Sequence, residues 1–271
     1  MTEFAVVVFP DRAKAYEGLK ALTDLHNEGS ATVYATAVVH RDADGALKVD
    51  ERSYEGPVGT ALATLVGALI GVFGGPAGVV AGAATGTLIG GTRDLLDVDV
   101  SDDFLGETET ELTPGKYAVV AEIAEDWTAP LDVRMGRIGG TVVRESRDAF
   151  ADTLMEQRAD AMRQSFKHFE AERASARAED MEDRLDAQLA REQKRLNAMA
   201  DKARTKIEER KAELNSKLEA LQVQAGKATP AVRSRIEQRI AALRQDFEGR
   251  GEQLRRAYEL STEAIKAQAQ V

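Results

Sequence analysis

The chain has 271 residues, no cysteine, and only 5% aromatic against 43% hydrophobic side chains. Without cysteine it cannot hold a disulfide framework, a thiol nucleophile, or a zinc or iron–sulfur site with Cys ligands. Its net charge of -10 argues against a nucleic-acid binder, because such a protein needs a basic face to neutralise phosphates. The acid excess lies in residues 1–144, with 11 Lys and Arg against 22 Asp and Glu, while residues 145–271 hold 25 against 24.

Residues 1–57 have the pattern of a small α/β unit. The predicted order is strand, helix, strand, turn and strand, at residues 4–9, 11–27, 31–40, 42–45 and 47–53. Asp11 offers an N-cap for the helix, and Gly29 stands where a C-cap glycine belongs. The short apolar run before Pro10 follows an acid and does not make a secretory signal, so we expect the chain to start in the cytoplasm.

Residues 93–144 repeat this pattern. Ser101 begins a helix, and strand, helix and strand follow at residues 117–123, 128–135 and 141–144. Two strand–helix–strand units on either side of an insertion predict the α+β class, with one four-stranded ferredoxin-like sheet covered by helices on one face. The insertion, residues 58–92, and a tail, residues 145–271, complete a four-part organisation.

The insertion predicts a glycine-zipper helical hairpin. It contains no charged residue, and Pro76 divides it into two arms. Nine small residues recur four apart within the arms: Gly59, Ala63, Gly67, Gly71, Gly75, Gly78, Gly82, Gly86 and Gly90. This spacing places them on one ridge of each helix, so that two backbones can approach closely in an oligomer or a membrane. No Walker-type lysine motif accompanies the glycines, so the segment is not predicted to bind phosphate.

Two environments for this hairpin stay open. The first arm, residues 59–75, has seven large apolar side chains but reaches only about 25 Å at ~1.5 Å per residue, against a hydrocarbon core of ~30 Å. The flanks of the hairpin are mostly acidic, whereas an anionic leaflet favours basic flanks. If the flanking units build one sheet, both ends of the insertion must lie on the same side of a membrane. The hairpin is therefore predicted either to embed in a bilayer or to pack in a soluble oligomer.

Several stretches of the chain resemble a known family. Besides the glycine-rich insertion they are residues 5–10, 100–104, 112–120 and 139–144. The sequence resembles there an uncharacterised bacterial group, domain of unknown function 1269, over about residues 1–144. The resemblance implies a ferredoxin-like domain interrupted by a glycine-zipper hairpin, in proteins described as predicted membrane proteins. It implies no activity and no catalytic residue, and the charged tail lies outside it.

Neither the acids nor the histidines have the spacing of a metal or catalytic site. Residues 94–111 hold eight acids, but the calcium-loop pattern that starts at Asp97 has Asp102 in place of the required glycine and Thr108 in place of the glutamate. The three histidines are scattered over a predicted helix end, a strand end and the tail: His26, His40 and His168. We read them as surface or packing residues, and we predict no catalytic residue, no metal site and no cofactor.

From residue 145 the composition changes to Ala, Glu, Arg, Lys, Gln and Leu, which predicts one long helix to residue 225. Gly226 ends it, and Thr229 with Pro230 starts a shorter antiparallel helix. The predicted coiled-coil seam has nine apolar residues: Ile207, Leu214, Leu218, Leu221, Ile236, Ile240, Leu243, Phe247 and Leu254. Because the helices differ in length, apolar residues near the start of the tail need another surface: Met162, Phe166 and Phe169. We therefore expect the tail to self-associate.

These features together predict a non-enzymatic, self-assembling scaffold or membrane-associated structural protein, a homo-oligomer held by its zipper and its coiled-coil tail. The alternative is a membrane-embedded stress or membrane-remodelling protein anchored by the hairpin. A third reading is a ferredoxin-like domain that binds a small molecule. We expect membrane contact through residues 58–92, a protein partner on the tail and no nucleic acid. The predicted location is the cytoplasm or the inner face of the cytoplasmic membrane.

Overall fold

The structure, a computed structural model, describes residues 2–53, 56–73, 100–146, 159–168, 171 and 179–268. The chain divides into two compact units, each made of two stretches of sequence. The first unit comprises Met1–Asp148 with Glu213–Gln245, and the second comprises Ala149–Ala212 with Asp246–Val271. The middle of the predicted tail, Glu213–Gln245, therefore packs with the N-terminal part of the chain.

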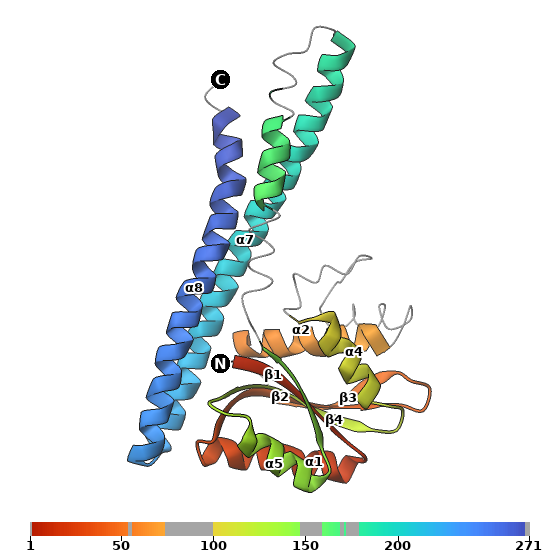
Figure 1. Cartoon of the computed structure of the whole chain (residues 1–271), viewed down its shortest axis with the longest axis vertical. Helices are drawn as coiled ribbons and strands as arrows, with labels where there is room; N and C mark the ends of the chain where they lie inside the picture. Colours follow the sequence, from red (N-terminus) through yellow and green to blue (C-terminus); the bar gives the residue numbers. More distant parts are fainter. Residues whose placement is uncertain are drawn as a thin grey trace. The chain divides into compact units, whose positions relative to one another are not determined.

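The first unit is built on one antiparallel sheet (Figure 1). Its five strands are β1 (Thr2–Phe9), β2 (Ala31–Arg41), β3 (Leu47–Ser53), β4 (Tyr117–Glu125) and β5 (Thr141–Ser146), in the order β3-β2-β4-β1-β5. Every neighbouring pair is antiparallel. The prediction of a four-stranded sheet is wrong, because β3 adds an edge strand that pairs with β2 from Thr36, opposite Ser53, to Arg41, opposite Leu47.

Helices cover both faces of this sheet. On one face lie α1 (Arg12–Asn27) and α5 (Ala129–Ile138), and on the other lie α2 (Gly56–Phe73) and α4 (Asp102–Glu111) (Figure 1). The expectation of helices on one face only is wrong. The reason can be seen in β1, where three successive valines at residues 6–8 are all buried. A strand covered on one face would alternate apolar and polar side chains instead.

Helix α2, the first arm of the predicted zipper hairpin, contributes to the core of the sheet. Leu62, Leu65 and Leu69 are fully buried in one cluster with apolar residues of β1, β2, β4 and α4. At the end of β2, the guanidinium of Arg41 lies 4.7 Å from the ring centre of Phe73. The apolar face that suggested membrane insertion is therefore covered by protein. The second arm, residues 77–91, lies outside the described residues.

Several predicted boundaries are confirmed by single hydrogen bonds. The side chain of Asp11 caps α1 by accepting from the Lys14 N–H at 2.9 Å. Ser101 caps α4 in the same way, accepting from the Phe104 N–H at 3.2 Å. Gly29 has a φ of 74°, a left-handed conformation that favours glycine. The chain can therefore turn sharply from α1 into β2.

Two long packed helices, α7 (Glu179–Lys227) and α8 (Pro230–Gln268), form most of the remaining chain. Pro230 begins α8, as predicted. In the second unit, Ala203 of α7 and Ala257 of α8 are fully buried in one apolar cluster. Such small side chains let two helix backbones approach closely.

The prediction of one helix from residue 145 to residue 225 is wrong. Strand β5 extends to Ser146, and residues 159–168 form a separate helix. Phe166 of this helix is fully buried against Leu189 and Leu196 of α7, which a single straight helix could not bring back to it. The contact supplies the surface that the apolar residues near the start of the tail were predicted to need. Phe169 lies outside the described residues.

We predict that Leu69→Ala lowers the free energy of unfolding by ~2–5 kcal/mol, because it leaves a cavity in the sheet core. Gly71→Ala is the matched control on the same helix, since a Cβ at Gly71 would meet nothing within 4 Å among the described residues. It should leave stability unchanged or raise it by up to ~1 kcal/mol, because alanine favours helix over glycine. Urea denaturation followed by circular dichroism measures both. Equal stabilities of the two variants would contradict the placement of α2 in the core.

Candidate functional site: the hairpin junction

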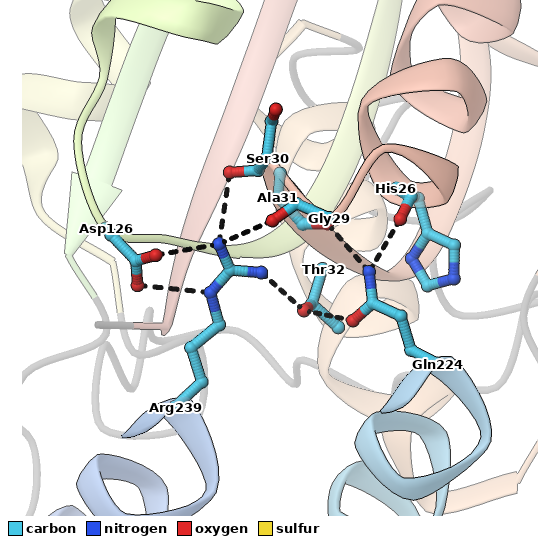
Figure 2. Close-up of polar contacts among 8 residues, drawn as sticks. All are labelled: His26, Gly29, Ser30, Ala31, Thr32, Asp126, Gln224 and Arg239. Atoms are coloured by element: carbon cyan, nitrogen blue, oxygen red, sulfur yellow. Dashed lines mark hydrogen bonds and ion pairs between the residues drawn. The ribbon is translucent and has the colours of Figure 1, made fainter. Parts of the chain in front are cut away.

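In the first unit, the turn of the α7–α8 hairpin lies against the end of the sheet where β2 begins and β4 ends. The contacts come from the polar ends of six side chains, which we call the hairpin junction: Thr32, Glu122, Asp126, Lys217, Gln224 and Arg239. Figure 2 shows four of them together with His26 and residues 29–31. All of them belong to the first unit, so the junction is a site within one compact body.

Arg239 of α8 is the central side chain of the junction and is only 5% exposed. Its Nε and Nη2 donate to the two carboxylate oxygens of Asp126, at 3.1 and 2.9 Å. Nη1 donates to Thr32 Oγ1, and Nη2 also donates to the carbonyls of Gly29 and Ser30, each at 3.1 Å (Figure 2). This set uses the planar fork of a guanidinium, which the point charge of a lysine cannot reproduce.

Gln224 of α7 continues the network on the other helix. Its Nε2 donates to the carbonyls of His26 at 2.6 Å and Ala31 at 3.1 Å. Its Oε1 accepts from the Thr32 hydroxyl at 2.7 Å. Because Thr32 donates to Gln224 and accepts from Arg239, one buried hydroxyl of β2 links α7 to α8 (Figure 2).

Lys217 and Glu122 form a second, fully buried ion pair, about two helical turns before Gln224 on the same face of α7. The Nζ of Lys217 lies 2.5 Å from Glu122 Oε1 and 2.6 Å from Glu213 Oε1. It also lies 5.2 Å from the ring centre of Tyr34, whose hydroxyl pKa is raised by burial and by the nearby carboxylate of Glu122. Removing such a pair from water costs about as much as its attraction returns. The pair therefore determines where the hairpin sits more than it adds to stability.

The backbone also approaches the hairpin closely at Gly29. A Cβ built on this residue would lie 2.1 Å from Cγ1 of Val232 on α8. Together with the positive φ, this distance excludes any side chain at residue 29. The glycine that ends α1 is thus also what lets α8 reach the carbonyls beside it.

A buried carboxyl pair lies at the same end of the sheet. Glu125 of β4 has a side chain only 4% exposed, with its Oε1 3.0 Å from Arg144 Nε. Burial and a hydrogen bond with Glu3 raise the pKa of Glu125 to about 8, although Arg144 opposes the shift. Arg144 also holds Asp132 of α5, at 2.7 Å. Glu125 therefore favours its neutral form in the fold.

A small cavity of about 190 Å³ opens beside the junction. It is lined by residues of α1, β2 and β3: Leu22, Thr23, His26, Val33, Tyr34, Ala35, Thr36 and Ser53. Neither Glu3 nor Glu125 lines it, so these two carboxyl groups and this cavity do not form one site.

His40 has its two ring nitrogens beside different carboxylates, with Nε2 2.8 Å from Asp42 and Nδ1 2.5 Å from Asp50. Its ring stacks on Tyr117 at 5.1 Å. Because the acids lie at opposite nitrogens, they cannot share one metal ion with this ring. Within the described ranges no group of three or more His, Asp or Glu side chains is placed to hold a metal. His168 is exposed in the second unit.

The predicted zipper residues are divided by the limits of the described chain. Gly59, Ala63, Gly67 and Gly71 lie on α2, where Gly59 and Gly67 are buried. The others lie outside the described residues: Gly75, Gly78, Gly82, Gly86 and Gly90. Close packing of two zipper arms stays a prediction. Among the described helices, none has the length and apolarity needed to cross a membrane.

The predicted coiled-coil seam is only partly covered. Leu221, Ile236 and Leu254 are fully buried. The other members are half-buried: Ile207, Leu214, Leu218, Ile240, Leu243 and Phe247. A two-helix hairpin covers one side of such a seam and leaves its rim in contact with water.

The sequence patterns do not single out the junction residues. One signal was present in β4, where Glu122 interrupts an otherwise apolar strand. A second was present in α7, where Lys217 and Gln224 are seven residues apart and flank the buried Leu221 on one helical face. Nothing in the pattern of α8 distinguishes Arg239 from its exposed neighbours Arg233 and Arg244.

One comparison with known proteins finds a family. A family described as a protein of unknown function, DUF1269, matches residues 59–172, so a DUF1269 domain covers that part of the chain. The match includes most of α2 together with α4, β4, α5 and β5, and it extends beyond β5 through the helix at residues 159–168. It begins and ends later than the resemblance over residues 1–144 implies. No curated protein and no solved structure matches the chain.

We predict that Arg239→Ala lowers the free energy of unfolding by about 3 kcal/mol, because it strands buried acceptors that the guanidinium serves. Arg244→Ala is the matched control, since it removes the same side chain from an exposed position of the same helix. It should change stability by no more than ~0.5 kcal/mol. Urea denaturation measures both, and similar effects of the two variants would show that the junction does not hold the hairpin.

The Glu3–Glu125 pair predicts a dependence of stability on pH. Because the pKa of Glu125 is raised to about 8 in the fold, the folded state binds more protons than the unfolded chain above the ordinary pKa of ~4.3. The free energy of unfolding should therefore fall as the pH rises from about 5 to about 8. Glu125→Gln should remove this fall, whereas Glu107→Gln, on the exposed side of α4, should keep it. An unchanged slope in Glu125→Gln would disprove the raised pKa of Glu125.

Proposed function

We propose that this chain, with its DUF1269 domain, is a non-enzymatic scaffold in which a ferredoxin-like sheet domain holds a helical hairpin in a defined position, and copies associate through that hairpin. The observation that carries the proposal is the hairpin junction. Three polar side chains from two helices, Lys217, Gln224 and Arg239, are buried against the sheet. A protein that uses its hairpin only as a loose tether has no need of such a joint.

The strand order supports the ferredoxin-like assignment. Strands β2, β4, β1 and β5 are adjacent in this order and mutually antiparallel, and α1 and α5 connect them as two strand–helix–strand units. This is the arrangement of a split βαβ fold. In this view β3 and the helices α2 and α4 belong to an insertion between the two units.

Self-association through the seam is supported by its incomplete cover. Leu214, Leu218, Ile240 and Leu243 belong to the hairpin within the first unit and are each half-buried. A single antiparallel pair of helices exposes one edge of its seam, and a second pair packed on that edge would remove it from water. We therefore take a second copy of the chain as the partner of this edge.

The small-residue ridge of α2 supports a role for the zipper. At 100° per residue, Gly59 and Gly71 lie roughly 60° and roughly 180° around the helix from the sheet-facing Leu62. Gly71, which is half-buried, thus lies on the side of α2 away from the sheet-facing leucines, and this leaves it for the second arm or for another copy. The buried leucines of α2 favour the scaffold over the membrane-embedded alternative, because entry of α2 into a bilayer would strip the sheet of part of its core.

The test is the native mass of the purified full chain, with and without detergent, over a range of concentrations. We expect a detergent-independent oligomer whose melting temperature rises with concentration. Leu243→Ala should weaken association roughly tenfold by removing apolar contact at the seam, while Ala242→Ser, at an exposed neighbour, should not. A monomer at tens of micromolar would refute the scaffold. Membrane retention after a carbonate wash, with a detergent-dependent mass, would instead favour the membrane-embedded protein.

A further inference from the structure

His26, at the end of α1, is hydrogen-bonded to β2 through its ring and to α7 of the hairpin through its backbone carbonyl. Its Nδ1 accepts from the Val33 N–H of β2 at 3.1 Å. Val33 lies beyond the last pair of β2 with β3, which joins Thr36 to Ser53, so the ring serves an amide that β3 does not reach. The carbonyl of His26 accepts from Gln224 Nε2 at 2.6 Å (Figure 2).

The bond to Val33 requires an unprotonated Nδ1, because a nitrogen that carries a proton cannot accept. In the folded chain the imidazole must therefore be neutral, with its proton on Nε2. A second proton on the ring would remove the acceptor and leave the Val33 N–H without it. It would also place a positive charge directly beside the Gln224 contact.

The charges around His26 make that second proton unfavourable while the hairpin is in place. From the hairpin side, Lys227 of α7 and Arg239 of α8 face it, and both lower its pKa after the larger effect of burial. The acid on that side, Asp126, has both carboxylate oxygens bound by Arg239. On the β2 side the neighbour is the phenol of Tyr34, which lines the same cavity. On α1 itself, Glu28 is bound by Arg134.

We propose that His26 makes the attachment of the hairpin to the sheet sensitive to mild acid, so that protonation of its imidazole releases the hairpin from the junction. This regulation rests on the proposed function in one respect: it assumes that copies of the chain associate through the hairpin. The release itself is a change within one molecule and does not require association.

The direction of the effect follows from linkage. With the hairpin in place the pKa of His26 lies below its ordinary value of ~6.5. Once the hairpin leaves, the charges of Lys227 and Arg239 are withdrawn and the pKa rises toward that value. Between these two values the released form binds more protons. Its population therefore grows up to about tenfold for each unit by which the pH falls in this window, and docking is fully restored above the ordinary value.

The experiment measures, in the full chain, the distance between one label on α1 and one label on α7 of the same molecule. Since the chain has no cysteine, Lys20→Cys on α1 and Gln222→Cys on α7, both exposed positions of the first unit, can carry two spin labels. The labelled chain is diluted with unlabelled chain so that only distances within one molecule are recorded, from pH 7.5 to pH 5.0. The single tryptophan, Trp127, is a second reporter, because Arg235 of α8 lies 6.0 Å from its ring centre.

We expect a longer second distance to appear reversibly below about pH 6.5, together with a change in Trp127 emission and without loss of helix by circular dichroism. His26→Gln keeps an acceptor that does not titrate and should abolish the response. The other two histidines supply the controls, since His40→Gln and His168→Gln should both retain it. An unchanged distance distribution down to pH 5.0, or an undiminished response in His26→Gln, would overturn the proposal.

A readout on the unmodified chain covers the case in which His26→Gln does not fold. In a proton–carbon NMR titration, the ring signal of His26 should change with a midpoint pH below the ordinary histidine pKa of ~6.5. A midpoint at or above that value would overturn the proposal. If the chain proves monomeric yet releases its hairpin in acid, the scaffold fails and the inference about His26 holds. If the chain assembles and the distance between the labels is insensitive to acid, the scaffold holds and the inference about His26 fails.

Discussion

The buried guanidinium of Arg239 joins four elements of the first unit through its hydrogen bonds. A charge withdrawn from water must find its hydrogen-bond partners inside the protein. Here they are two carbonyls after α1, the hydroxyl of Thr32 and both oxygens of Asp126. To supply them, the chain must turn sharply at Gly29, and β2 must begin beside the end of β4. One side chain thus relates α8, α1 and two strands.

The same end of the sheet carries two groups whose titration acts in opposite directions. Glu125 favours its neutral form in the fold, so its raised pKa makes the fold less stable as the pH rises. His26 also favours its neutral form, but because it is a base its lowered pKa makes the fold less stable as the pH falls. Both follow from the same cause, which is the removal of an ionisable group from water. The first unit is therefore expected to be most stable at intermediate pH.

Helix α2 illustrates how one apolar sequence serves different solvents. Its leucines fit a bilayer as well as they fit the face of a sheet, because hydrocarbon and protein core offer nearly the same transfer free energy. What decides is the sheet, whose central strands are apolar on both faces and need a helix on each. The predicted one-sided cover left one of those faces without a partner, and α2 with α4 fills it.

The sequence by itself determined the helices and strands described within residues 2–53 and 100–144, the caps at Asp11 and Ser101, and the start of α8 at Pro230. These depend on neighbours within a few residues, where period and backbone preference act. It did not determine that β3 joins the sheet, that the helix at residues 159–168 packs against α7, or that Arg239 meets Asp126. Arg239 and Asp126 are more than a hundred positions apart in the chain. The sequence pattern of a helix is the same whether a charged residue on it faces water or a buried carboxylate. Only the tertiary structure brings the two together and removes the water.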